Sequence, residues 1–151
     1  CTMHNAQCTI GASPMVHCAL CIPIIYIRAR MKSDDENLIA NKSKAFALRS
    51  IKLYEHLQTK PEKAITRQLL KSSTSIGANV KEALRGQSDA DFGAKMNIAL
   101  KEACETEYWL ELLDESGILE HKIAVSFLSE CRELIRILTA IVKSTFNKGK
   151  H

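Results

Sequence analysis

Apolar residues recur three and four positions apart along most of the chain after residue 33. This spacing places them on one side of an α-helix, and four stretches of the chain show it. The breaks between these stretches fall at Thr59 to Glu62, at Gly86 and at Ser116-Gly117. The one candidate strand, residues 22–27, is interrupted by Pro23. Long helices with short connections pack as antiparallel neighbours, so we predict an all-α protein, an antiparallel up-down-up-down four-helix bundle with long helices.

The first two helices are predicted from their capping residues and their apolar stripes. The first begins either at the capping sequence Ser33 to Glu36 or near Asn41. Its buried stripe is predicted to comprise Leu38, Ala45, Phe46, the aliphatic stem of Arg49, Leu53 and Leu57. The second begins at Thr59, has Pro61 in its first turn and ends at Gly86 in a left-handed C-cap. Its stripe is predicted to comprise Ile65, Leu69, Ser72, Ile76, Val80 and Leu84.

The third and fourth helices carry the longest stripes. The third has a capping-box start at Ser88 and Asp91, and its stripe comprises Phe92, Met96, Ala99, Ala103, Thr106 or Glu107, Leu110 and Leu113. The fourth begins near Glu120, and its heptad-like stripe comprises Ala124, Phe127 or Leu128, Cys131, Leu134 or Ile135, Leu138, Ile141 or Val142, and Thr145. In the second helix, small residues around Gly77 predict a close helix contact, which outweighs the cost of about 1 kcal/mol for a helical glycine.

Residues 1–30 differ in kind from the rest of the chain. They contain no acidic residue and no helical periodicity, and they hold four of the six cysteines. We interpret Met31 as the natural start, residues 1–30 as an unstructured or non-native leader, and residues 31–151 as the bundle domain. The apolar run at residues 19–27 is too short to span a bilayer, so no membrane partner is expected. The uneven cysteine distribution indicates reduced thiols and a cytoplasmic protein.

Composition supports one domain and no enzyme class. The 151 residues are 46% hydrophobic, which permits a real core, and the formal net charge of +4 neither requires nor excludes a nucleic-acid partner. No glutamate has a histidine three residues later, so the di-iron pattern of helical bundles is missing, and phosphate-binding loops are missing too. We therefore expect no metal, no cofactor and no catalytic residue. Cys104, between Glu102 and Glu105, is interpreted as a packed, inert thiol.

Two sets of polar residues are candidates for function. Asn79 and Glu107 lie on or beside apolar seams, where an unpaired polar group is costly. They form either a ligand or subunit-specifying pocket or a hydrogen-bond network that sets helix register, and we favour the network.

The second candidate set is basic. Lys63, Arg67, Lys81 and Arg85 fall on one face of the second helix, with Lys71 close by. From Glu102 to Glu120 every formal charge is negative. The basic residues could bind phosphates, face solvent, or pair with the acidic helix of another subunit, and the sequence leaves these three alternatives open.

One stretch of the second and third helices resembles a known family. The matching residues are Ser75-Ile76-Gly77-Ala78-Asn79-Val80, Glu82, Phe92, Asn97-Ile98-Ala99-Leu100 and Glu105-Thr106-Glu107. In their order and spacing they resemble bacterial 23S rRNA-intervening-sequence proteins, over about Lys42 to Ser144. The superfamily also includes the accessory protein of diversity-generating retroelements. The resemblance implies a small bundle that assembles as a ring-like homo-oligomer, commonly a pentamer, and that associates with nucleic acid.

From the residues and the resemblance together we expect a non-enzymatic, oligomeric interaction protein. It would bind RNA or a ribonucleoprotein through the basic residues of the second helix. The alternative is a structural protein-binding scaffold with no affinity for nucleic acid.

Overall fold

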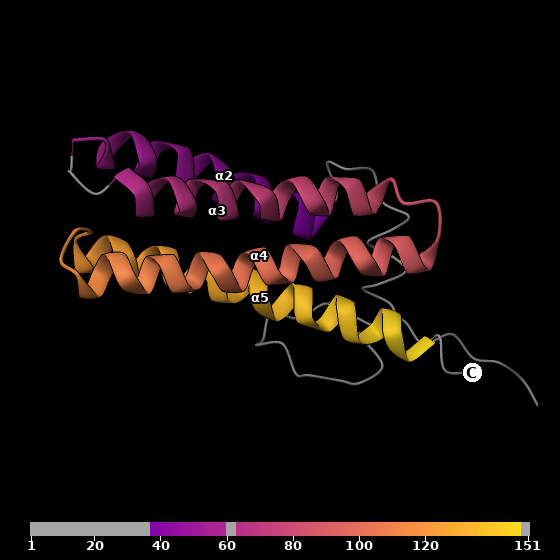
Figure 1. Ribbon diagram of the computed structural model, residues 1–151. Coiled ribbons are helices and arrows are strands. Elements are labelled where there is room, and N and C mark those ends of the chain that lie inside the picture. Colours follow the sequence, from indigo (N-terminus) through magenta and orange to yellow (C-terminus); the bar gives the residue numbers. More distant parts are fainter. Residues whose placement is uncertain (1–36, 60–62, 149–151) are drawn as a thin grey trace, which may run out of the picture.

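A computed structural model describes residues 37–59 and 63–148. Four helices, and no strand, occur in this part of the chain: α2 (Leu38–Leu57), α3 (Lys63–Leu84), α4 (Asp89–Glu115) and α5 (His121–Lys148). They run up and down as an elongated bundle (Figure 1). The all-α, four-helix prediction is confirmed. The predicted leader, the Met31 start and the Ser33 capping sequence lie outside the described residues.

The helices pack in chain order around a shared core. The most extensive packing joins α3 to α4 and α4 to α5, α2 packs mainly on α3, and a smaller contact joins α2 to α5. Because α2 and α4 occupy diagonal corners, the α3–α4 edge lies opposite the α2–α5 edge. The stripes predicted for α4 and α5 are buried, including Phe92, Met96 and Leu110 of α4 and Cys131 and Leu138 of α5.

The stripe predicted for α2 was partly wrong. Leu38 is 57% exposed, and Ala45 is exposed as well. The buried residues of α2 are Ile39, Ser43, Phe46, Ser50, Leu53 and Leu57. Two of them are serines that the predicted stripe did not include. Each satisfies its hydroxyl by donating to a carbonyl of its own helix: Ser43 to Ala40 and Ser50 to Phe46. The helix begins at Leu38 behind the N-cap residue Asn37, between the two predicted starts.

The helix ends explain where the connections lie. The Ser88 cap is confirmed, since its hydroxyl accepts the backbone N–H of Asp91 at 3.1 Å. Thr59 donates to the His56 carbonyl at the end of α2, and the cap expected from it on α3 involves residues 60–62, which lie outside the described residues. The left-handed conformation predicted for Gly86 was wrong, because among the described glycines only Gly117 has a positive φ, of 70°. Space around Gly86 is tight, because a Cβ there would lie 3.0 Å from the Ala83 carbonyl oxygen.

The membrane prediction was based on residues 19–27, which lie outside the described residues. None of the four described helices is long and apolar enough to cross a membrane.

Candidate nucleic-acid interface

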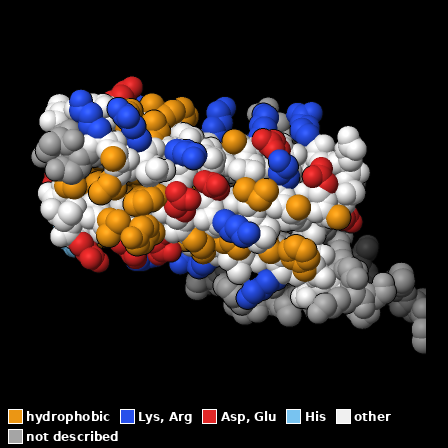
Figure 2. Space-filling view, viewed as in Figure 1, with side chains coloured by type: hydrophobic (Ala, Val, Ile, Leu, Met, Phe, Trp, Pro, Cys, Tyr) orange, Lys and Arg blue, Asp and Glu red, His pale blue; other side chains and the backbone are white. Residues whose placement is uncertain are grey.

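The residues expected to bind phosphates lie along the outer side of α3. We call Lys63, Arg67, Lys71, Lys81 and Arg85 the basic face, and all five side chains are exposed. Their position follows from the opposite side of the helix, which buries Leu69, Ile76 and Val80 in the core. Figure 2 shows Lys and Arg side chains gathered over the α2 and α3 half of the molecule.

Several cations of this half have no acidic partner within the described chain. Lys63, Arg67 and Lys71 form no ion pair with any described residue. Glu82, also on α3, pairs instead with Lys95 of α4. The exposed Lys44 of neighbouring α2 adds a further positive charge to this half. A surface of this kind attracts anions, and the attraction falls as salt is added.

The acidic residues of α4 are partly used inside the chain. Arg132 of α5 donates to Glu107 at 2.6 Å and to Glu111 at 2.8 Å. The pKa of Arg132 is raised, and its hydrogen bond to Glu107 is the largest cause. Asp114 lies 3.0 Å from the imidazole of His121. Glu111 therefore has a cationic partner within its own chain, whereas the exposed Glu105 and Glu115 of α4 form no ion pair with a described residue.

The polar pair predicted on the seam is not brought together. The Asn79 amide donates to the Ser75 carbonyl of its own helix at 2.9 Å, whereas Glu107 faces Arg132 on the α4–α5 side. A buried side-chain hydrogen bond instead joins α3 and α4 at another place, where the Thr106 hydroxyl donates to the Ser72 hydroxyl at 2.9 Å. This contact was not predicted, although both residues were on the predicted stripes, so hydroxyl residues at stripe positions of two adjacent helices were the signal that could have indicated it.

The described cysteines differ from the expectation for Cys104. That residue is exposed, while Cys131 is buried. Partial burial, and then the Glu107 carboxylate, raise the pKa of Cys104, so its thiolate is disfavoured as predicted although the side chain is not packed. Among the described residues, no three His, Cys, Asp or Glu side chains are grouped as metal ligands.

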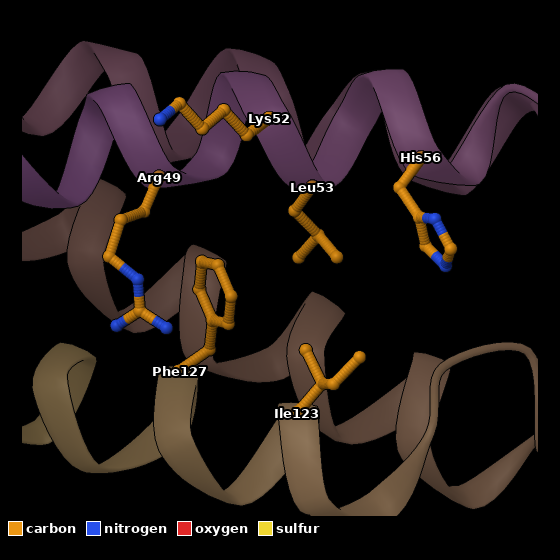
Figure 3. Close-up of a pocket in the computed structure, with 6 residues that line it drawn as sticks. All are labelled: Arg49, Lys52, Leu53, His56, Ile123 and Phe127. Atoms are coloured by element: carbon orange, nitrogen blue, oxygen red, sulfur yellow. The ribbon is translucent and has the colours of Figure 1, made fainter.

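A shallow hollow on the α2–α5 edge was not predicted from the sequence. Its volume is about 280 Å³ and it is lined by Arg49, Lys52, Leu53, His56, Ile123 and Phe127 (Figure 3). The Arg49 guanidinium lies 4.3 Å from the centroid of the Phe127 ring, and it also pairs with Glu130. The hollow therefore has an apolar floor and a basic rim. Only the tertiary structure assembles it, because its residues lie about 70 positions apart in the chain.

Comparison with known proteins places the chain. The sequence pattern of the 23S rRNA-intervening sequence proteins matches residues 35–140. The chain belongs to this family. The resemblance drawn from the α3 and α4 residues is thereby confirmed.

One solved structure is similar to this chain in both sequence and fold. It is a protein of unknown function from the S23 ribosomal protein family, from Bacteroides thetaiotaomicron VPI-5482. The two chains are 44% identical with a TM-score of 0.68, and the match covers 70% of this chain and 99% of the other. No curated protein matches the chain.

Proposed function

We propose that this protein is a non-enzymatic, cytoplasmic interaction module that assembles as a homo-oligomer and binds RNA through the basic face of α3. The observation that carries the proposal is the set of five exposed cations on one side of one helix, of which Lys63, Arg67 and Lys71 lack an acidic partner in the described chain. Surface cations that are not neutralised within the chain are available to neutralise phosphates.

The geometry of the basic face suits the phosphate backbone more than the bases. From Lys63 to Arg85, the residue that follows the end of α3, the basic face spans about 33 Å at 1.5 Å per residue, which is long enough to follow several phosphates. No aromatic residue is interleaved with these cations on α3, so there is no platform for stacking bases. Binding should therefore depend on charge and shape and have little sequence preference.

Two further considerations favour RNA as the nucleic acid and an oligomer as the form that binds it. The family description refers to 23S rRNA, and the solved relative is assigned to the S23 ribosomal protein family, so RNA is the first nucleic acid to test. An oligomer would repeat the basic face once per subunit. Repetition strengthens phosphate binding through effective concentration without any new contact within a subunit. The family resemblance suggests five copies.

A protein-binding scaffold is the second candidate. It is favoured by large apolar side chains at the surface, among them Leu48 at 53% and Tyr108 at 53% exposed. Apolar contacts of this kind would hold a partner protein with little sensitivity to salt, unlike phosphate contacts.

The proposal is tested by titrating the chain with a short RNA duplex and with one of its strands. We expect affinity to fall steeply between about 50 and 200 mM salt. Arg67→Glu with Lys71→Glu should lower the slope of log affinity against log salt by about 2, one for each lost phosphate contact. Both side chains are exposed, so the fold should be unchanged.

A matched control reverses two exposed cations on another helix. Arg136→Glu with Lys143→Glu on α5 changes the net charge equally but leaves the basic face intact. This variant should keep nearly the affinity and the salt slope of the unmutated chain. If both double variants weaken binding alike, binding follows net charge and not the basic face. An unmutated chain with no RNA affinity at low salt would favour the protein scaffold.

A further inference from the structure

The outer side of α4 carries two aromatic residues, Tyr108 and Trp109. The side of the helix on which each lies follows from its spacing to Thr106. Thr106 faces α3, since it contacts Ser72, and Trp109 follows three residues later on the same side. Tyr108, beside it, is 53% exposed, and the two rings lie 5.1 Å apart. Leu112, partly buried, comes one turn after Tyr108. We call Tyr108, Trp109 and Leu112 the aromatic patch, and it lies toward the α3–α4 edge.

On its own helix the aromatic patch is flanked by negative charge. From Glu102 to Glu115 the chain has six acidic and no basic residues. Glu105 accepts the Trp109 indole N–H at 3.0 Å, and Glu115 is exposed at the other end of the patch. An apolar surface edged by carboxylates should bind an apolar surface edged by cations.

The hollow on the α2–α5 edge is such a surface. Leu53, Ile123 and Phe127 form its floor, and its rim is basic, with Arg49, Lys52 and His56 (Figure 3). Lys52 is exposed and has no acidic partner among the described residues. The volume of the hollow, about 280 Å³, is below the ~300–1,000 Å³ of typical small-molecule sites, so the hollow suits a protein side chain better than a cofactor.

The two surfaces lie at the same height on the bundle. Arg49, at the hollow, pairs with Glu130 of α5. Arg132 follows two residues later on α5, a rise of about 3 Å, and pairs with Glu107 and Glu111 of α4. Tyr108 and Trp109 lie between these two glutamates in the chain. The hollow and the patch therefore occupy one level, on opposite edges. Figure 3 shows the α2–α5 edge, and in Figures 1 and 2 the α3–α4 edge faces the viewer.

We propose that the aromatic patch of one copy docks into the α2–α5 hollow of a second copy, with Tyr108 as the anchor. This inference rests on the oligomer of the proposed function and names the two surfaces that form it. Because the surfaces differ, the contact is head-to-tail and can repeat from copy to copy. Because they share one height, successive copies follow with no rise along the bundle axis, which favours a closed ring over a helical filament.

The test uses variants that disable one surface at a time, measured by size-exclusion chromatography with light scattering. Tyr108→Ala removes the anchor from the patch. Lys52→Glu with His56→Glu replaces two basic residues at the rim of the hollow with acidic ones. All three residues are exposed, and circular dichroism checks that the fold is retained. Loss of an anchor residue should weaken the contact about 30-fold, and each variant alone should shift toward the mass of one 16.9 kDa chain.

Mixing the two defective variants gives the sharper result. The first keeps a sound hollow and the second a sound patch, so the mixture should form a dimer with one copy of each and stop there. Ile98→Ala, another exposed apolar residue of α4, and the Arg136→Glu, Lys143→Glu variant are the controls, and both should keep the unmutated mass.

Three outcomes would overturn the docking contact. If both variants keep the unmutated mass, the oligomer forms through other surfaces. If mixing gives no dimer, the two surfaces do not bind each other. A chain that is monomeric at every concentration rejects the contact and the oligomer together; if its hollow then binds indole-3-acetate in a Lys52-dependent way, the occupant is a small aromatic anion. RNA affinity, measured on the same samples, reports separately on the basic face.

Discussion

The two described cysteines show how one residue type acquires opposite properties on neighbouring helices. Cys131 of α5 is buried, and its thiol donates to the Ala103 carbonyl at 3.3 Å. Burial, followed by the Glu107 carboxylate, raises its pKa to about 12. Cys104 of α4 is exposed. The difference comes from which side of each helix faces the core, and not from the neighbours of each cysteine in the sequence.

We expect Cys104 to react with iodoacetamide at pH 8 while Cys131 stays unmodified. The thiolate attacks the reagent and displaces iodide. Cys131 hardly forms a thiolate at pH 8, because its pKa is raised to about 12, and its side chain is buried away from the reagent. Peptide mapping by mass spectrometry distinguishes the two sites. In denaturant the ordinary thiol pKa returns, so both cysteines should be modified. Labelling of Cys131 as fast as Cys104 in the folded chain would contradict its burial.

At the scale of helices, two glycines occupy contacts of different tightness. A Cβ at Gly77 of α3 would lie 3.6 Å from the Ser43 carbonyl oxygen of α2, which is an ordinary van der Waals distance. At Gly93 of α4 it would lie 2.7 Å from Cγ2 of Thr145 of α5, too close for any Cβ. The Thr145 side chain cannot easily turn away, because its hydroxyl donates to the Ile141 carbonyl at 2.9 Å.

We predict that Gly77→Ala raises the free energy of unfolding by about 0.5–1 kcal/mol, because alanine has the better helix propensity and the methyl group fits. Gly93→Ala gains the same propensity but overpacks the α4–α5 contact at a cost of about 1–3 kcal/mol. It should therefore be the less stable of the two in urea denaturation. Thr145→Ser removes the Cγ2 methyl, so adding it to Gly93→Ala should restore part of the loss. Equal stabilities of the two alanine variants would contradict the close α4–α5 approach.

The whole molecule is held together unevenly. α4 packs extensively on both neighbours, whereas α2 packs mainly on α3 and only slightly on α5. The α2–α5 edge is supported by Lys42–Glu133 and Arg49–Glu130, whose side chains are about 40% exposed, and by the edge-on contact of Phe46 with Phe127 at 5.9 Å. Exposed ion pairs add little to stability, so this edge depends mainly on a few apolar contacts.

We expect backbone amides in the middle of α2 to exchange with deuterium faster than those in the middle of α4. Local opening costs less where fewer apolar contacts must be broken. Native-state hydrogen exchange at increasing denaturant measures the opening free energy of each helix. The comparison is made on the Tyr108→Ala variant as well, because a copy docked on the hollow would protect α2. Opening free energies that are equal in α2 and α4 would show that the four helices open as one unit.

Several features could be predicted from the sequence because they depend on local spacing. The 3.6-residue period sets each buried stripe, so Phe92, Met96, Leu110 and Leu138 were assigned correctly to the core. The Ser88 cap depends on residues three apart in one turn, and it was also correct. The exposure of the basic face followed from the same period, because its five cations lie opposite the apolar stripe of α3.

Other features depend on how helices rotate and pair, and only the tertiary structure decided them. In α2, stripes starting at Leu38 and at Ile39 both fit the period, and packing against α3 and α5 selected the second, which buries Ser43 and Ser50. Glu107 pairs with Arg132, 25 residues away, and not with Asn79. The hollow and the aromatic patch lie on opposite edges of the bundle. They lie at one height because packing sets Arg132 of α5 beside Glu107 and Glu111 of α4. Spacing along a chain determines the face of a helix, whereas contacts between helices determine what that face meets.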